Sequence, residues 1–248
     1  MAGIIVTGMH RSGTSLFSKY LMTCGINMGE RLLEADRGNP LGYYEDLEIV
    51  QFHDKVLKRN GCGYFFDRFP KICLNDEEIE EAKHIASNSV IKNWKDPKTI
   101  LFLDYWSDFL PNDTKYIFLY RDPVRVSDSL IRRRTDKVIN QFPHLAIQNW
   151  YIYNKLLYRF TQKISSEKYL IINIDNFLSN FVEQHRIIVD FLGSMIVNSD
   201  IKLTSFFHTD HFKKNIEKTS PMSIKSKILY SWYRYKSYRL FKKLEIKL

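Results

Sequence analysis

The chain opens with Gly3-Ile-Ile-Val-Thr-Gly8, then Met9, then His10-Arg-Ser-Gly-Thr-Ser15, and this stretch decides the fold. The first run is short and apolar and ends in glycine, as buried strands of parallel sheets often do. From Leu16 to Cys24 the apolar residues recur at helical spacing. The opening is therefore predicted to be a strand, a glycine-containing loop and a helix that begins near Thr14.

The loop between this strand and this helix has the composition of an anion site. Its glycines allow the backbone to curl around a ligand, and the helix offers unpaired N–H groups and the positive end of its dipole. Ser12, Thr14 and Ser15 add hydroxyl donors, and Arg11 can bind two oxygens of one anion. The ATPase loop carries a lysine where this chain has Thr14. We therefore expect the Gly8–Ser15 loop to bind a phosphate-like group rather than to form a plain turn.

The rest of the chain alternates between strands and helices. Further strands are predicted at Ser89–Asn93, Lys115–Tyr120 and Lys168–Ile174. Helices are predicted at Leu47–Arg59, Asn75–Ser87, Thr99–Leu110, Pro123–Arg134, Gln141–Ser165 and Phe177–Leu192, and a Gly/Asn/Pro-rich loop at Gly38–Gly42. Asn75 suits the N-cap of the second of these helices. This alternation predicts an α/β fold with a P-loop-type parallel β-sheet flanked by helices on both faces. Residues 1–219 are expected to form this domain, and residues 220–248 a basic, aromatic, helical tail.

A second anion site is predicted after the clearest strand, Lys115–Tyr120. Asp122 suits the N-cap of the next helix and Pro123 its first turn. Arg121 then lies at the carboxyl end of a strand, where open α/β sheets bind ligands. Ser129 lies two turns along the helix, so Arg121 and Ser129 are expected to hold one anion together. The alternative is a capped helix with a solvated basic flank.

Together these stretches resemble the superfamily of sulfotransferases that use 3′-phosphoadenosine 5′-phosphosulfate (PAPS), in particular bacterial members, and at several points the tyrosylprotein branch. The similar stretches follow the order of the family and reach from Ile4 to about Gly193. They are Gly8–Ser15, Gly42–Asp46, Lys95–Pro97, Arg121–Ser129 and Asn173–Leu178. The resemblance implies an enzyme that transfers a sulfuryl group from PAPS to an acceptor hydroxyl, in line, with a carboxylate base and no metal.

The resemblance also implies roles for individual residues. Lys95 and Arg11 are implied to stabilise the transferring or bridging oxygens, although Lys95 could also be a surface lysine beside a helix start. Because ATP has no 3′-phosphate, an anion site for this phosphate would make the chain selective for PAPS over ATP. The implied contacts to the 5′-phosphosulfate are Arg11, Ser12, Gly13, Thr14 and Ser15, and those to the 3′-phosphate are Arg121 and Ser129.

The attacking hydroxyl must lose its proton to a group within hydrogen-bond reach. Related enzymes place an acid on the loop near Gly42, which makes Glu45 the first candidate for the base and Asp46 the second. Asp46 also suits the N-cap of the following helix, so the pair can divide between catalysis and capping. His10 and His53 are weaker candidates, because a lone histidine is more often structural.

The acceptor is less well specified. A carbohydrate is expected from the family branch and not from any residue. Trp150, Tyr151 and Tyr153 could stack on a sugar, but they suit the core face of a helix better. The main alternative enzyme is a P-loop small-molecule kinase that uses ATP, and Thr14 in place of lysine argues against it. A non-catalytic binding protein is the other alternative.

The charge and the cysteines indicate partners and compartment. The net charge of +9 over 248 residues favours anionic partners, but the chain lacks a nucleic-acid-binding motif. The segment from Met222 to Leu248 has eight basic residues and one acidic residue, and its Ile224, Ile228 and Trp232 share one helix face. Docking of this tail on an anionic membrane is therefore a hypothesis, and packing on the body is the alternative.

The three cysteines show no metal-ligand spacing, which fits a reducing compartment. We find no charged-then-apolar leader and no apolar run of about 18 residues. The expected location is the cytoplasm, with peripheral contact to the inner face of the membrane if the tail docks.

Overall fold

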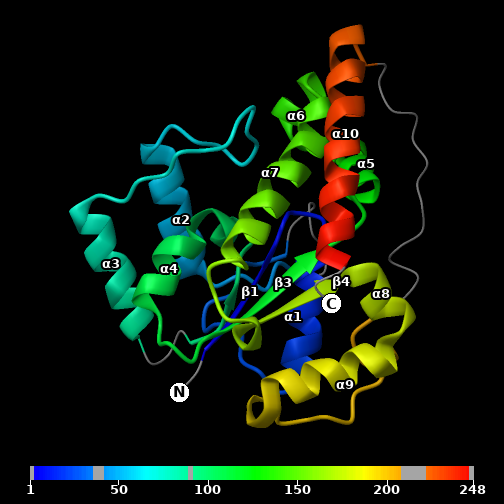
Figure 1. Cartoon of the computed structure of the whole chain (residues 1–248). Coiled ribbons are helices and arrows are strands. Elements are labelled where there is room, and N and C mark those ends of the chain that lie inside the picture. The colour runs from blue at the N-terminus through cyan, green and yellow to red at the C-terminus, as the bar shows by residue number, and fades with distance from the viewer. Residues whose placement is uncertain (1–2, 36–41, 89–91, 208–221, 246–248) are drawn as a thin grey trace.

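One parallel sheet organises the fold (Figure 1). The computed structural model describes residues 3–35, 42–88, 92–207 and 222–245. Within them the strands lie in the order β2 (Trp94–Lys95), β1 (Ile4–Gly8), β3 (Lys115–Tyr120) and β4 (Tyr169–Asn173). Each neighbouring pair is parallel, with registers such as Val6 opposite Lys95 and Gly8 opposite Leu119. The parallel sheet predicted from the sequence is confirmed.

Helices cover both faces of this sheet, because side chains alternate along each strand. Ile5 and Phe118 face a core that is built mainly with α2, α4 and α7. Val6 and Leu119 face the other core, which α1, α8 and α9 complete. The prediction of helices on both faces is therefore also confirmed.

The helices follow the predicted order. The α-helices are α1 (Thr14–Thr23), α2 (Leu47–Arg59), α3 (Asp76–Ser87), α4 (Leu103–Phe109), α5 (Pro123–Arg133), α6 (Lys137–Gln141), α7 (His144–Phe160), α8 (Ile174–Ser179), α9 (Phe181–Leu192) and α10 (Ile224–Glu245). Short 3₁₀ turns are η1 (Pro97–Phe102), η2 (Ser166–Lys168), η3 (Gly193–Met195) and η4 (Leu203–Ser205). The predicted caps hold at three of these helices: Asp46 accepts from an N–H group at the start of α2, Asn75 forms a capping box on α3, and Asp122 accepts from two N–H groups at the start of α5.

The second strand and the helix after it differ from prediction. The strand expected at Ser89–Asn93 lies at Trp94–Lys95, because Ile5 pairs with Trp94. Residues 89–91 of the expected strand lie outside the described residues, as do residues 38–41 of the expected Gly/Asn/Pro-rich loop. The helix expected at 99–110 begins earlier, as the 3₁₀ turn η1, and becomes an α-helix only at Leu103.

Two predicted helices are each divided. The helix expected at 141–165 is interrupted at Pro143, so that α6 ends at Gln141 and α7 runs only from His144 to Phe160. Proline cannot continue a helix that precedes it but fits the start of the next one. The helix expected at 177–192 is divided at Asn180, whose φ of −122° and ψ of 44° are not helical.

Helix α10 packs lengthwise on α7 and also contacts α5 (Figure 1). Ser237, Leu240 and Leu244 are buried in this contact. Tyr238 donates through its hydroxyl to Oδ2 of Asp122 at 3.3 Å. The domain boundary expected between residues 219 and 220 lies outside the described residues. None of the helices within the described ranges is long and apolar enough to cross a bilayer.

Candidate active site

The carboxyl ends of the four strands meet at one edge of the sheet, and a polar residue lies at or just after each of them. β1 leads into the Gly8–Ser15 loop, and β2 ends at Lys95. β3 is followed directly by Arg121, and Asp175 lies two residues beyond the end of β4. This edge is where open α/β sheets bind ligands, so the candidate site is built here.

The conformation of the Gly8–Ser15 loop requires glycine at position 13. Gly13 has φ +83°, and a Cβ atom there would lie 2.5 Å from Cγ1 of Ile174 at the start of α8. Arg11 has φ +70° although it is not glycine, a strained conformation that recurs at functional sites. The Oγ atom of Ser12 is buried without a hydrogen-bond partner among the described residues. A buried donor of this kind is suited to an arriving anion.

Arg11 joins the loop to the predicted second anion site. Its Nε atom donates to Oγ of Ser129 on α5 at 2.9 Å. Burial lowers the pKa of Arg11, and the positive charges of Arg133 and Arg121 lower it further. These guanidinium groups therefore crowd one place, where a bound anion would relieve their mutual repulsion.

Arg121 lies beside the loop and does not face away from it. It donates through Nε to Oδ1 of Asp175 at 3.0 Å, and its Nη2 lies 3.0 Å from the same oxygen. Ile174, which precedes Asp175 in the chain, packs against Gly13 of the loop. The structure thus brings Arg121 and Ser129 to the same region, but Ser129 pairs with Arg11 and Arg121 with Asp175.

Lys95 connects the loop to the candidate base. This lysine is fully buried and donates through Nζ to Oε1 of Glu45 at 2.7 Å. The same ammonium group lies 3.3 Å from Oγ of Ser15, in the first turn of α1. Burial raises the pKa of Glu45, and the positive charge of Lys95 acts in the opposite direction. A carboxylate whose pKa is raised is a better proton acceptor.

Asp46, the second candidate for the base, is fully engaged as a cap. Its Oδ1 accepts from the N–H of Glu48 in the first turn of α2 at 2.9 Å. Its Oδ2 accepts from the N–H groups of Glu30 and Arg31 at 3.0 and 3.4 Å. Because both oxygens of Asp46 already accept from backbone N–H groups, Glu45 remains the first candidate of the pair.

His53 is a structural residue. Its ring is fully buried, with Nδ1 at 2.7 Å from Oδ2 of Asp96 and Nε2 accepting from Nε1 of Trp106 at 2.9 Å. This network assigns the proton to Nδ1. Although burial opposes its charged form, Lys98 and the hydrogen bond from His53 hold the pKa of Asp96 below its usual range.

His10 lies in the wall of the cavity described next. Burial, with help from Lys98 and Lys95, lowers its pKa from 6.5 to about 4, so the imidazole is neutral near pH 7. Its Nε2 atom is buried without a hydrogen-bond partner among the described residues. His10 is therefore a second candidate proton acceptor in this site.

A cavity of about 740 Å³ opens beside Arg11 and Glu45, within the usual range for small-molecule sites. Tyr64 and Lys98 are among the residues that line it. Nζ of Lys98 lies 2.7 Å from Oδ1 of Asp54 and 5.4 Å from the centre of the Tyr64 ring. The lining residues include His10, Thr14, Ser15, Tyr43, Phe65, Pro97, Leu130, Arg133, Thr135 and Asp136.

The aromatic residues proposed for sugar stacking lie elsewhere. Trp150 and Tyr153 are fully buried in the core, and Nε1 of Trp150 donates to the carbonyl oxygen of Arg121 at 2.9 Å. Tyr151 lies against Tyr233 of α10, with ring centres 6.0 Å apart. None of the three is among the described residues that line the cavity, so the core interpretation is the correct one.

Sequence reasoning missed several residues of the site. Arg133 lies one turn beyond Ser129 on α5, and that spacing could have indicated a shared helix face. Asp54 and Tyr64 carried no motif and become site residues only through the fold. The described residues contain no cluster of three or more His, Cys, Asp or Glu that could hold a metal ion.

Comparison with solved structures identifies the fold. The chain is similar to a sulfotransferase from Alicyclobacillus acidocaldarius, with 15% identity over 99% of this chain and 96% of that one and a TM-score of 0.52. It is also similar to the sulfotransferase domain from the curacin biosynthetic pathway, with 14% identity over 93% of this chain and 96% of that one and a TM-score of 0.52. No protein-family model matches the chain, and no curated protein matches it.

Proposed function

We propose that this chain, which has the fold of sulfotransferases, transfers a sulfuryl group from PAPS to an acceptor hydroxyl. The observation that carries the proposal is the buried pair of Lys95 and Glu45, 2.7 Å apart and held against Ser15 of the anion loop. Sulfuryl transfer needs a cation where charge develops and a base for the attacking hydroxyl. The pair supplies both at the edge of the cavity.

The residues present fit PAPS as the donor. The buried hydroxyl of Ser12 and the N-terminus of α1 suit the 5′-phosphosulfate. We assign the 3′-phosphate to Arg121 and Ser129, with Arg11 between the two anions because it belongs to the loop and donates to Ser129. When bound, PAPS supplies a sulfuryl group on a phosphate leaving group.

The proposed transfer requires only PAPS and the acceptor hydroxyl. The acceptor oxygen forms a bond to sulfur, and the bond from sulfur to the bridging phosphate oxygen breaks. Glu45 takes the proton of the acceptor hydroxyl, while Lys95 and Arg11 stabilise the negative charge left on the bridging oxygen. We predict that no metal is needed, because a sulfuryl group carries less negative charge than a phosphoryl group.

We further propose a carbohydrate as the acceptor and the cytoplasm as the location. The cavity offers the rings of Tyr64 and Phe65 for stacking, and the Lys98–Asp54 pair for hydrogen bonds to hydroxyl groups. This mixture of aromatic and charged side chains suits a polyhydroxylated ligand better than a purely apolar one. The three cysteines are free thiols, which supports a reducing compartment. The similarity to the tyrosylprotein branch stays a prediction.

Calorimetric titration with adenosine 3′,5′-bisphosphate tests donor binding. We expect tight binding that EDTA does not change, and weakening of about 10- to 100-fold in Arg121→Ala, because charge-assisted hydrogen bonds contribute about 1.5–3 kcal/mol. Arg68→Ala removes an equal charge from a highly exposed loop position and should leave binding unchanged. Tighter binding of ATP than of the bisphosphate would favour the kinase alternative.

Glu45→Gln tests the base separately. We expect the bisphosphate to bind at least as tightly as in the parent, because Glu45 no longer competes for the ammonium group of Lys95, and turnover to fall by about 10²- to 10⁴-fold. If turnover persists, the proton goes to another group, and His10 is then the next residue to replace.

A further inference from the structure

The first turns of α10 and the short helix α6 expose apolar side chains at one end of the molecule. We name this surface the α6–α10 tip. Ile224 is 78% exposed, Ile228 65% and Trp232 48%. The tip consists of Val138 and Phe142 from α6 and its C-cap, and Ile224, Ile228, Trp232 and Tyr235 from α10.

The two parts of the tip lie side by side (Figure 1). Nδ1 of His144 at the start of α7 lies 3.2 Å from Oγ of Ser226 in the first turn of α10. The ring centres of Phe142 and His144 are 6.3 Å apart. The exposed end of α6 therefore adjoins the exposed beginning of α10.

The apolar stripe of α10 faces away from the body. Ile224, Ile228, Trp232 and Tyr235 follow one another at intervals of four, four and three residues, which places them on one face. The buried residues Ser226 and Ser237 lie on the opposite face, against the body. The stripe is therefore not the face with which α10 packs on α7.

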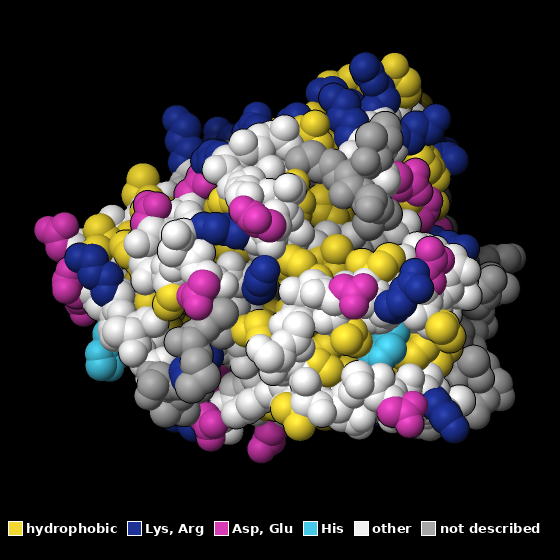
Figure 2. Space-filling model, turned by 60° about the horizontal axis from the view of Figure 1, so that its bottom comes forward, with side chains coloured by type: hydrophobic (Ala, Val, Ile, Leu, Met, Phe, Trp, Pro, Cys, Tyr) yellow, Lys and Arg dark blue, Asp and Glu magenta, His cyan; other side chains and the backbone are white. Residues whose placement is uncertain are grey.

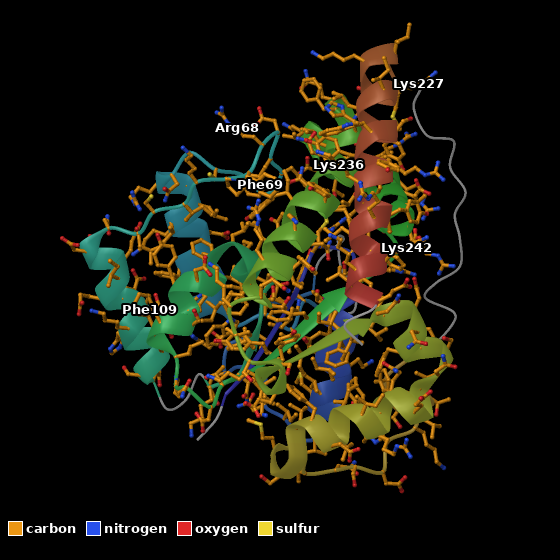
Figure 3. The ribbon with its side chains drawn as sticks, in the orientation of Figure 1. Arg68, Phe69, Phe109, Lys227, Lys236 and Lys242 are labelled. Atoms are coloured by element: carbon orange, nitrogen blue, oxygen red, sulfur yellow. The ribbon has the colours of Figure 1, made fainter. Side chains whose placement is uncertain are left out.

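Positive charge surrounds this stripe. Between Met222 and Glu245 the helix carries seven basic residues and one acidic residue. In Figure 2 the Lys and Arg side chains gather at the protruding end at the upper right, with hydrophobic side chains among them. Figure 3 places Lys227 near the protruding N-terminal end of α10, Lys236 in its middle and Lys242 toward its C-terminal end. Nζ of Lys236 lies only 3.5 Å from the ring centre of Trp232.

We propose that the α6–α10 tip docks on the surface of an anionic lipid bilayer. Six of the twelve exposed large hydrophobic side chains among the described residues belong to this tip, so the exposure is concentrated and not scattered. Cations beside aliphatic and aromatic side chains match anionic head groups above an apolar layer. Nucleic acid is a less suitable partner for this surface, because its binding rests on phosphate contacts, to which exposed isoleucine and valine side chains contribute no favourable binding energy.

Docking would also orient the candidate active site. Asp136 lines the cavity and caps α6, since its Oδ1 accepts from the N–H of Ile139 at 2.9 Å. The rim of the cavity and the tip are thus joined through one short helix. A docked molecule would hold the mouth of the cavity beside the lipid head groups.

Tryptophan fluorescence gives a site-specific assay on the full chain. Of its four tryptophans, Trp94, Trp106 and Trp150 are fully buried and Trp232 is exposed. Vesicles of equal parts phosphatidylcholine and phosphatidylglycerol with brominated acyl chains should quench Trp232, and Trp232→Phe should abolish the quenching. Vesicles of phosphatidylcholine alone should quench far less, and high salt should weaken the effect.

Two double variants decide whether the tip is responsible. Ile224→Ser with Ile228→Ser should weaken vesicle binding by about tenfold or more. Val182→Ser with Val197→Ser replaces two β-branched apolar side chains that lie outside the tip and are 84% and 82% exposed, and should bind as the parent does. Equal binding by both variants, or retention on RNA without vesicle binding, would overturn the proposal. Binding of adenosine 3′,5′-bisphosphate should be unchanged in all variants, which separates docking from the proposed catalysis.

Discussion

Replacing Lys95 with methionine removes a fully buried cation and leaves the carboxylate of Glu45 without its partner at 2.7 Å. Methionine has a similar length and apolar stem, so the change tests charge more than volume. The matched variants are Glu45→Gln, which leaves the ammonium group without its carboxylate, and the double variant, which removes both charges.

The expected magnitude follows from the burial of the pair. At 2.7 Å and an effective dielectric constant of about 20, the Coulomb attraction is roughly 6 kcal/mol, and desolvation of both groups offsets much of it. Removing one partner of a buried pair costs about 3–5 kcal/mol, whereas replacing both is nearly neutral. We therefore expect each single variant to lower the free energy of unfolding by about 3 kcal/mol or more, and the double variant by less than about 1 kcal/mol.

The pH dependence of the two single variants should differ. Burial raises the pKa of Glu45 and Lys95 lowers it, so without Lys95 the pKa of Glu45 moves further above its usual value. Below this raised pKa the carboxyl group is neutral and its burial is less unfavourable, so the destabilisation by Lys95→Met should shrink as the pH falls from about 7 to about 5. In Glu45→Gln the carboxyl group is absent, so this source of pH dependence is absent too.

Urea unfolding of the parent and the three variants at both pH values measures these differences. A coupling free energy below about 1 kcal/mol, the value of exposed ion pairs, would refute the claim that Lys95 and Glu45 form a sequestered unit. A penalty for Lys95→Met that does not change with pH would refute the assignment of the raised pKa to Glu45.

Two further predictions concern the loop. Gly13→Ala should lower the free energy of unfolding by about 1–3 kcal/mol and weaken bisphosphate binding, because φ is +83° and the new Cβ would lie 2.5 Å from Cγ1 of Ile174. Gly63→Ala, where nothing lies within 4 Å of the added Cβ, is its near-neutral control in urea unfolding. The folded pKa of His10 is lowered to about 4, so the parent should lose stability as the pH falls from 6.5 to about 4, where only the unfolded chain binds the proton. His10→Gln should show a shallower loss in urea midpoints over that range, and an identical slope would contradict this.

The strands and helices that the sequence predicted well carry their signal locally. The run Ile4–Gly8 is apolar and flanked by glycine. Asn75 and Asp122 predict the starts of their helices, because these residue types suit the N-cap position. The short strand Trp94–Lys95 carries no such local signal, because two residues show no period. Pairing with Ile5 and Val6 of β1 makes it a strand, and pairing between distant segments cannot be read from composition.

The site shows the same limit. Each polar residue at a strand end could be placed, since parallel strands bring their carboxyl ends to one edge. The partners depend on side-chain direction across elements: Ser129 was expected to join Arg121, yet it accepts from Arg11, while Asp175 binds Arg121. The stability of such ion pairs depends on burial and exact neighbours, which only the folded arrangement supplies.

The position of Lys95 links anion binding to the strength of the base. Thr14 leaves the loop without the lysine that ATPases carry there, and Lys95 brings an ammonium group to Ser15 from the neighbouring strand, with Glu45 as its partner. An anion on the loop would compete with Glu45 for this ammonium group. As the ammonium group turned toward the anion, Lys95 would lower the pKa of Glu45 less, and the carboxylate would become a stronger base. We infer that donor binding would itself strengthen Glu45 as the proposed base, because the lysine that meets the anion on the loop is also the partner of this carboxylate.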